Sequence, residues 1–275
     1  IYHTSSTHTV NGKTFTPESS YLIPLNQPQY RLIKSMFEKR TKFEDSLFYD
    51  ISSWTLPLAF GLEYEEMKGG VKPGEKITEV KISQGKRIDG NTEYAYVFET
   101  YGYYAPRAIY RLLSHGLRVK VASDPFFHSS GRKFDRGTIM VPVAGQEKRK
   151  DQIESIVNDI ATKDGIDVFA FHTGLDYNGT SLGSNSFLPL KKPSIAMIVG
   201  DGISPTEVGE VWHMLDNRFG IPVTLLPVNV LDKASLNRYS TIILPPTVGT
   251  FSVSEGVKEK LKTWTQNGGV LIGLK

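Results

Sequence analysis

The strongest constraint on the fold is an alternation of short apolar runs with amphipathic helical patterns over residues 194–275. The apolar runs, each short enough for one buried strand, are "SIAMIVG", "VTLLPV", "STIILPP" and "GGVLIGL". The apolar residues at helical spacing between them are Val208, Val211, Trp212, Leu215 and Phe219, then Val257, Leu261 and Trp264. Buried strands that alternate with helices are typical of a parallel sheet covered on both faces. We therefore expect a doubly wound, flavodoxin-like α/β domain here.

Both ends of the chain indicate a piece of a longer protein. The first residue is Ile1 and not methionine, and no signal-peptide pattern follows it. The last apolar run reaches Lys275, where a doubly wound unit ordinarily continues into a loop and a helix. We expect an excised or processed chain whose last domain is truncated.

A similar alternation predicts a first α/β domain over residues 68–171. The strand candidates are "EKITEVKIS", "EYAYVFE", "LRVKVAS", "GTIMVPV" and "DVFAF". One helix begins near Pro106 and is closed by Gly116, and a second covers about 148–163. Helices of this length between strands predict a largely parallel sheet.

The remaining residues are assigned to flanking segments. For residues 1–67 the sequence predicts an extended leading segment with a turn at Asn11-Gly12. A helix from Tyr30 to about Arg40 and an aromatic-rich packing segment are expected to follow. Residues 172–193 contain several glycines and prolines and no periodic apolar pattern, so we expect a linker between the two α/β domains.

Composition excludes several classes of function. A formal net charge of +3 over 275 residues, with dispersed basic side chains, does not favour nucleic-acid binding. The longest apolar runs fall short of the roughly 18 residues that a membrane span needs. The chain has no cysteine, which rules out disulfides, thiolate nucleophiles and Cys-based metal sites.

The histidines do not form a metal-binding pattern. None of them begins H-x-x-E or H-E-x-x-H, and the H-x-x-D at His213 lies on an ordinary amphipathic helix. The six are His3, His8, His115, His128, His172 and His213. We expect no metal and no cofactor bound by this chain.

The stretch "HTGLDYNGTSLG" resembles a hydrolase motif in its spacing. Residues 179–183 satisfy G-x-S-x-G around Ser181, and His172 and Asp176 stand just upstream. A nucleophile elbow requires a strand that runs into the serine and a helix that leaves it. The nearest predicted strand ends well before Ser181, and "LGSNSFLPLKKP" after it favours no helix. A glycine-rich joint is therefore the preferred interpretation, and we expect no catalytic residue here.

The stretch "VGDGISPTEVGEVW" places glycines between a strand and a helix. The dinucleotide fingerprint G-x-G-x-x-G fails because Pro205 occupies its third glycine position. Ser204 is a predicted N-cap with Pro205 at N1, and Glu207 disfavours phosphate at this helix start. A site for a neutral ligand at this strand end stays open, with Asp201 as its candidate residue.

The richest polar cluster is "FETYGYYAPR" at the end of one predicted strand and the start of a helix. Open α/β sheets place ligands at such positions. The candidate ligand-binding residues are Glu99 for charge, Tyr101, Tyr103 and Tyr104 for stacking and hydroxyl groups, and Arg107 as a clamp for a carboxylate. The alternative is a tyrosine-rich packing corner between the domains.

Three long blocks carry a resemblance to a known family. They are "YLIPLNQPQYRLIKSMFEKRTKFEDSLFYDISSWTLPLAF", "GYYAPRAIYRLLSHGLRVKVA" and "KKPSIAMIVGDGISPTEVGEVWHMLDNRFGIPVTLL". They resemble the region downstream of the catalytic domain in large bacterial zinc carboxypeptidase-like proteins. The likeness covers roughly residues 15–275, and the later part resembles class I glutamine amidotransferase-like α/β domains.

The resemblance implies a non-catalytic accessory region. In that family the upstream peptidase domain binds zinc through an H-x-x-E pair and a later histidine, and no such motif stands in this chain. Amidotransferases of that class need a cysteine nucleophile, and this chain has no cysteine. The implied partner is the peptidase domain of the same polypeptide, and zinc is expected only there. The implied location is exported, periplasmic or extracellular.

Two functions follow as expectations. The first is an accessory region that packs against a zinc carboxypeptidase domain or helps to position its substrate. The second is a small-molecule binding module in which the 99–107 loop holds a carboxylate, a peptide or a sugar.

Overall fold

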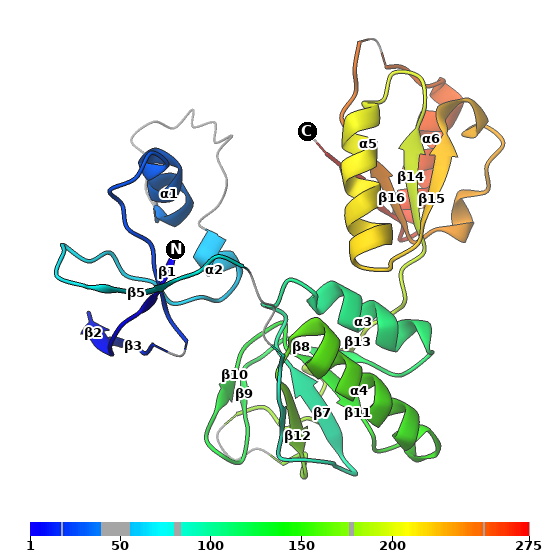
Figure 1. The fold of residues 1–275 in the computed structure, drawn as a ribbon. Helices are drawn as coiled ribbons and strands as arrows, with labels where there is room; N and C mark the ends of the chain where they lie inside the picture. Colours follow the sequence, from blue (N-terminus) through cyan, green and yellow to red (C-terminus); the bar gives the residue numbers. More distant parts are fainter. Residues whose placement is uncertain (18, 40–55, 80–83, 176–178, 250, 275) are drawn as a thin grey trace. The chain divides into compact units, whose positions relative to one another are not determined.

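The chain divides into two compact units, residues 1–83 and residues 84–275. A computed structural model describes residues 1–17, 19–39, 56–79, 84–175, 179–249 and 251–274 (Figure 1). The sequence predicts a boundary after residue 67, whereas the structure divides the chain after residue 83.

The first unit contains a small antiparallel sheet. Strand β1 (Tyr2–Thr4) lies between β4 (Tyr21–Leu22) and β5 (Pro73–Lys76) and is antiparallel to both. The expected strand "EKITEVKIS" therefore begins inside a strand of the first unit rather than in the α/β sheet that follows. Helices α1 (Tyr30–Phe37) and α2 (Leu56–Ala59) belong to the same unit. The rest of the predicted aromatic-rich segment lies outside the described residues.

The predicted turn at Asn11-Gly12 is confirmed. Strands β2 (His8–Val10) and β3 (Lys13–Phe15) form an antiparallel hairpin around it. Asn11 has φ 50° and Gly12 has φ 81°, which are the positive values that a two-residue hairpin turn requires. The leading segment is therefore partly built from short strands.

The first α/β body of the second unit is a six-stranded sheet with the order β13-β8-β11-β7-β12-β6. Its strands are β6 (Arg87–Ile88), β7 (Ala95–Phe98), β8 (Lys120–Ala122), β11 (Ile139–Pro142), β12 (Val168–Phe171) and β13 (Phe187–Pro189). The expectation of a largely parallel sheet is wrong here. Only the β12–β6 pair is parallel, and the other four pairs are antiparallel.

The two helical crossovers explain this difference. The connection β7-α3-β8 skips one position in the sheet, and β11 fills that gap antiparallel to both strands. The connection β11-α4-β12 likewise skips the position that β7 occupies. These are two interleaved split βαβ units. Helix spacing along the chain cannot reveal whether a crossover lands on the neighbouring strand or one further away.

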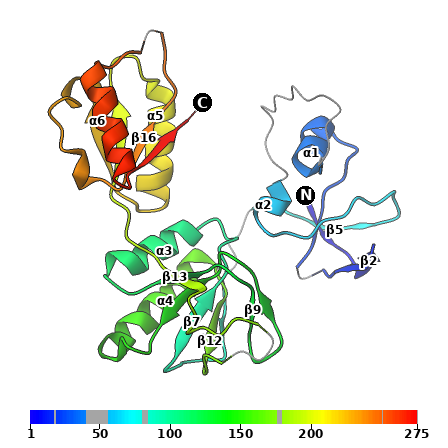
Figure 2. The ribbon, with the colours of Figure 1, turned by 180° about the vertical axis from the view of Figure 1, so that it is seen from behind.

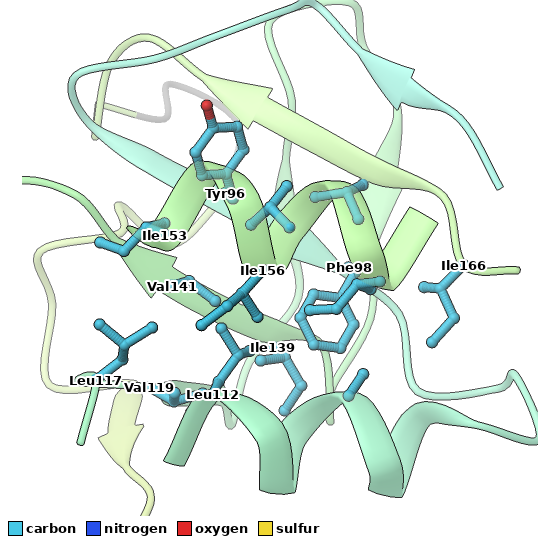
Figure 3. Packing of buried hydrophobic residues seen from close by; sticks show 14 of the residues in the cluster. Tyr96, Phe98, Leu112, Leu117, Val119, Ile139, Val141, Ile153, Ile156 and Ile166 are labelled. Carbon is cyan, nitrogen blue, oxygen red and sulfur yellow. The ribbon is translucent and has the colours of Figure 1, made fainter. Parts of the chain in front are cut away.

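Helices α3 (Ala105–Ser114) and α4 (Lys150–Asp164) cover one face of this sheet (Figure 1). A short 3-10 turn, η1 (Glu147–Arg149), leads into α4. Alternate strand residues such as Tyr96, Phe98 and Ile139 point at the helices and pack with Leu112 and Ile153 (Figure 3). This side is the larger hydrophobic core of the body.

The opposite face is covered by an aromatic hairpin. Strands β9 (Phe126–Phe127) and β10 (Lys133–Phe134) pair antiparallel, and their buried phenylalanines pack on the sheet residues that face away from the helices. The phenylalanines of this cluster are Phe126, Phe134, Phe169, Phe171 and Phe187. Both faces are thus buried, which explains why every residue of β7 and of β12 is buried.

The predicted linker over 172–193 is only partly a linker. Residues 187–189 form β13, which pairs with β8 at the edge of the sheet. Leu182 and Phe187 are buried in the aromatic cluster. Because edge strands can be three residues long, the apolar pattern was too short to indicate one here.

The second α/β body confirms the predicted parallel sheet. Its order is β15-β14-β16-β17, and all three neighbouring pairs are parallel. The strands are β14 (Ile195–Val199), β15 (Val223–Pro227), β16 (Thr241–Leu244) and β17 (Val270–Gly273). Helices α5 (Pro205–Trp212) and α6 (Glu255–Gln266) cover opposite faces, since α5 lies in front in Figure 1 and α6 in front in the reversed view of Figure 2.

Short irregular helices complete this body. A π-helical segment, η2 (His213–Arg218), continues α5 toward β15. Two 3-10 turns, η3 (Val228–Val230) and η4 (Leu236–Arg238), connect β15 with β16. The core includes Ile198, Ile242, Val257 and Trp264.

Candidate functional site

The predicted polar cluster lies where β7 ends and α3 begins. Phe98 is fully buried at the end of β7, and the chain then turns at the surface before the N–H of Ala105 donates to the carbonyl of Gly102 at 2.9 Å. Tyr101 and Tyr103 are 41% and 48% exposed. We call Glu99, Tyr101 and Tyr103 the tyrosine surface.

Arg107 points away from this surface toward helix α4. Its Nε donates to Asp164 Oδ1 at 2.7 Å, and its Nη2 donates to the carbonyl of Lys163 at 2.9 Å. Its guanidinium also lies 3.7 Å from the centre of the Tyr104 ring, which is a cation–π contact. The predicted role of Arg107 as a carboxylate clamp stays a prediction, and that role would require breaking this ion pair.

Asp164 is the centre of a buried ion-pair cluster. Its side chain is fully buried, and Arg111 Nη1 donates to its second oxygen at 2.9 Å. Two guanidinium groups from α3 therefore hold one carboxylate from the end of α4. Because removing either partner would leave a charged group without its counterpart, the cluster ties the two helices together.

Glu99 also has a protein partner. Its Oε2 lies 2.7 Å from Nη2 of Arg132, which follows the turn of the β9–β10 hairpin. The Arg132 guanidinium in turn lies 4.4 Å from the centre of the Phe169 ring. The carboxylate of Glu99 is thus already engaged in an ion pair with Arg132.

The hydroxyl of Tyr101 remains a hydrogen-bond donor well into the alkaline range. Partial burial raises the pKa of Tyr101 above its ordinary value, and the negative charges of Glu99 and Asp135 add to the rise. With two exposed rings and a protonated phenol, the tyrosine surface is suited to stacking and hydrogen bonding.

The second candidate position, Asp201, lies in the loop after β14. This loop pairs with the loop after β16: Ser204 N–H donates to the Pro246 carbonyl and Val248 N–H donates to the Gly202 carbonyl, both at 2.9 Å. These bonds tie together the two loops that follow the strand ends, where doubly wound sheets hold ligands. Asp201 itself is exposed.

The helix start at Ser204 is confirmed. Its hydroxyl accepts the Glu207 N–H at 3.5 Å, with Pro205 as the first residue of α5. The glycines of this stretch therefore serve a turn and a helix cap.

The G-x-S-x-G stretch does not form a nucleophile elbow in the described residues. Residues 179–181 are irregular, and the next regular element is the strand β13 rather than a helix. His172 Nε2 lies 3.1 Å from the carbonyl oxygen of Asp89. The partner of this histidine is therefore a residue far upstream in the chain and not Ser181. Asp176 lies outside the described residues.

The structure brings together a different group of Asp, His and Ser side chains, which the sequence did not indicate. They are Asp89, His128 and Ser130. The ring of His128 is buried, and its Nε2 lies 3.2 Å both from the Ala170 carbonyl and from Asp89 Oδ2. Its Nδ1 lies 2.9 Å from Ser130 Oγ. These residues come from three separate segments, so no spacing along the chain could have predicted the group.

The His128 group is best explained as an anchor for the hairpin. The Ser130 N–H also approaches Nδ1 at 3.3 Å, which is the pattern of a local turn. The ring packs edge-on against Phe171 with 4.6 Å between centroids. Both ring nitrogens therefore have partners within the protein, and the contact with the Ala170 carbonyl fixes the hairpin on β12.

The described residues contain neither a metal-binding cluster nor a membrane-spanning helix. The described ranges contain no group of three or more His, Asp or Glu side chains that could hold a metal ion. No helix in the described part of the chain is both long and apolar enough to cross a membrane. Comparisons with protein-family models, curated proteins and solved structures find no significant match to this chain.

Proposed function

We propose that this chain is a non-catalytic accessory region of a zinc carboxypeptidase-like protein that helps to position a substrate for a peptidase domain. The observation that carries the proposal is that the charged residues of the candidate cluster already form ion pairs within the protein. Arg107 is bound to Asp164, and Glu99 is bound to Arg132, while the exposed groups beside them are tyrosines. This combination favours binding over chemistry.

The second α/β body supports the finer assignment of fold. Its strand order β15-β14-β16-β17 is the order of the first four strands of a flavodoxin-like sheet. Class I glutamine amidotransferase-like domains are similarly parallel, and the later part of the proteins that this chain resembles is similar to such domains. The chain supplies no cysteine for their chemistry.

The direct test is a zinc analysis of residues 1–275 combined with an assay on peptides that have a free C-terminus. The expected result is less zinc than protein and no release of C-terminal amino acids. Stoichiometric zinc, or turnover that is lost on chelation, would contradict the accessory role. A peptidase domain from the same polypeptide, added to the assay, is expected to gain affinity for substrate.

The alternative function is a binding module that uses the tyrosine surface. The exposure of Tyr101 and Tyr103 favours it. Thermal-shift screening with blocked peptides and oligosaccharides tests this function, with Tyr101→Ser as the site variant. Arg107→Ala is an unsuitable probe because it also breaks the Asp164 pair. The matched control is Tyr21→Ser, since Tyr21 is exposed and lies in the other compact unit.

A further inference from the structure

We infer that two copies of this chain associate through antiparallel pairing of their β17 strands. Strand β17 lies at one end of the sheet of the second α/β body, and among the described residues it pairs with β16 alone (Figure 2). The exposed fractions along it are 52% for Val270, 42% for Leu271, 40% for Ile272 and 38% for Leu274. This surface is separate from the tyrosine surface and does not depend on the proposed function.

The two edges of this sheet differ in their protection against further pairing. Strand β15, at the other edge, is preceded by Pro222 and ends at Pro227, and a proline has no N–H to donate to another strand. Natural edge strands commonly carry prolines, charges or bulges that prevent such pairing. Residues 268–274 contain no proline and no charged side chain, and the register of β17 with β16 is regular. Strand β17 thus has the composition of a strand that is paired on both sides.

The main chain of β17 decides which residues can bond to a partner strand. The Val270 N–H donates to the Ser240 carbonyl at 3.0 Å, and the Leu274 N–H donates to the Leu244 carbonyl at 2.9 Å. Because successive residues of a strand direct their main-chain groups to opposite sides, those of residues 271 and 273 point to the open edge. A twofold axis at residue 272 places residue 271 of each copy opposite residue 273 of the other. Each such pair exchanges two hydrogen bonds.

The side chains of β17 fit the same register. Ile272 meets Ile272 of the other copy, and Val270 meets Leu274. These three side chains lie on one face of the strand, because alternate residues of a strand share a face. On the opposite face Leu271 lies across from Gly273, which has no side chain to obstruct it. Apolar cross-strand pairs of this kind stabilise a sheet.

The neutrality of the strand favours a second copy as the partner. A twofold axis brings equivalent residues of the two strands close together, so a charged residue near residue 272 would face its own charge. Strand β17 has none. One register satisfies the outward main-chain groups and pairs large side chains with apolar or small ones, using this sequence alone. This self-complementarity is what a twofold interface requires. The two four-stranded sheets would then join into one continuous sheet.

The test is sedimentation velocity of residues 1–275 over a range of protein concentrations. We expect a reversible monomer–dimer equilibrium with a dissociation constant of roughly 10–100 µM, because one short strand from each copy makes a small interface. Ile272→Lys places two like charges opposite each other and should weaken the dimer about tenfold or more. The matched control is Leu225→Lys on the other edge strand, where Leu225 is 47% exposed. It should leave the dimer unchanged, and both variants should retain the parent's thermal transition.

Introduced cysteines test the register, since the chain has no cysteine of its own. Ile272→Cys faces the same residue of the other copy, with Cα atoms about 4.5 Å apart, and should form a disulfide-linked dimer under mild oxidation. Leu271→Cys faces Gly273 and should not. The inference is overturned if the parent sediments as a monomer up to millimolar concentration, or if Ile272→Lys associates as well as the parent. Dissociation by Leu225→Lys, or cross-linking of Leu271→Cys but not of Ile272→Cys, would also overturn it.

Discussion

The two α/β bodies of residues 84–275 use the same local alternation of strands and helices, yet they build different sheets. In the first body each crossover skips a strand position, and an antiparallel strand fills the gap. In the second body every neighbouring pair is parallel. The helix between two strands therefore does not determine which strands become their neighbours in the sheet. A strand from elsewhere in the chain decides this by pairing between them.

The two sheets also differ in how well they are covered. All four residues of β7 are buried between the helices and the aromatic hairpin. All four residues of the edge strand β17 are exposed, although three of them are large and apolar. A strand that is apolar on both faces is typical of a sheet interior. The same kind of sequence therefore contributes very different amounts of buried area in the two bodies.

The largest expected effect concerns the aromatic face of the first body. Phe126 is fully buried and contacts Phe134, Phe171 and Phe187. Phe126→Ala should lower the free energy of unfolding by about 4 kcal/mol, because it removes a large ring and leaves a cavity. Urea denaturation followed by circular dichroism measures this. A loss below about 1 kcal/mol would show that the hairpin face is not a core.

The next effect concerns the ion pairs that join α3 and α4. Asp164→Ala should cost about 3 kcal/mol, because it leaves Arg107 and Arg111 partly buried without their counter-charge. The control is Asp159→Ala on the same helix, whose partner is the exposed Lys163. It should change stability by less than about 0.5 kcal/mol. Equal effects of the two substitutions in denaturation experiments would refute the special role of Asp164.

A much smaller effect is expected at the open edge of the second body. Leu271 is 42% exposed on β17. Leu271→Ser should therefore lower the free energy of unfolding by about 0.5 kcal/mol and reduce self-association, since less apolar surface is exposed. Denaturation curves and light scattering measure the two quantities. A cost comparable to that of Phe126→Ala would mean that this strand is covered in solution.

The smallest effect is a pH dependence at the tyrosine surface. The raised pKa of Tyr101 means that folding favours the neutral phenol, first through burial and then through Glu99 and Asp135. The resulting stabilisation is present below the ordinary tyrosine pKa and is lost as the pH rises through the higher folded value. Carbon NMR of labelled tyrosine, with Tyr101→Phe for assignment, follows the titration. Glu99→Gln should lower the pKa, and no change would exclude an effect of its charge.

Local patterns predicted the individual elements of the α/β bodies well. The short apolar runs in the sequence located β7, β12, β14 and the later strands. Pro106 and Ser204 indicated where two of the helices begin. These features depend on neighbours within a few residues, where capping and side-chain periodicity act. Short strands such as β6, β9 and β13 were missed because two or three residues carry too little pattern.

The candidate site was predictable only in its position. The sequence indicated a polar cluster at the end of β7, and the structure places Tyr101 and Tyr103 at the surface there. It did not indicate that Arg107 would be held by Asp164, because their side chains meet only when α3 packs beside α4. For the same reason the His128 group could not be found from spacing.

The sequence by itself determined the long helices and most of the longer strands in residues 84–275, the absence of cysteine chemistry, and the turn at Asn11-Gly12. Only the tertiary structure decided the direction of strand pairing in the first body, the partners of the charged side chains, and the exposure of β17. The physical reason is the separation along the sequence over which each kind of interaction acts. Periodicity and capping act within one or two turns of chain, whereas sheet order and ion pairs join residues that are dozens of positions apart.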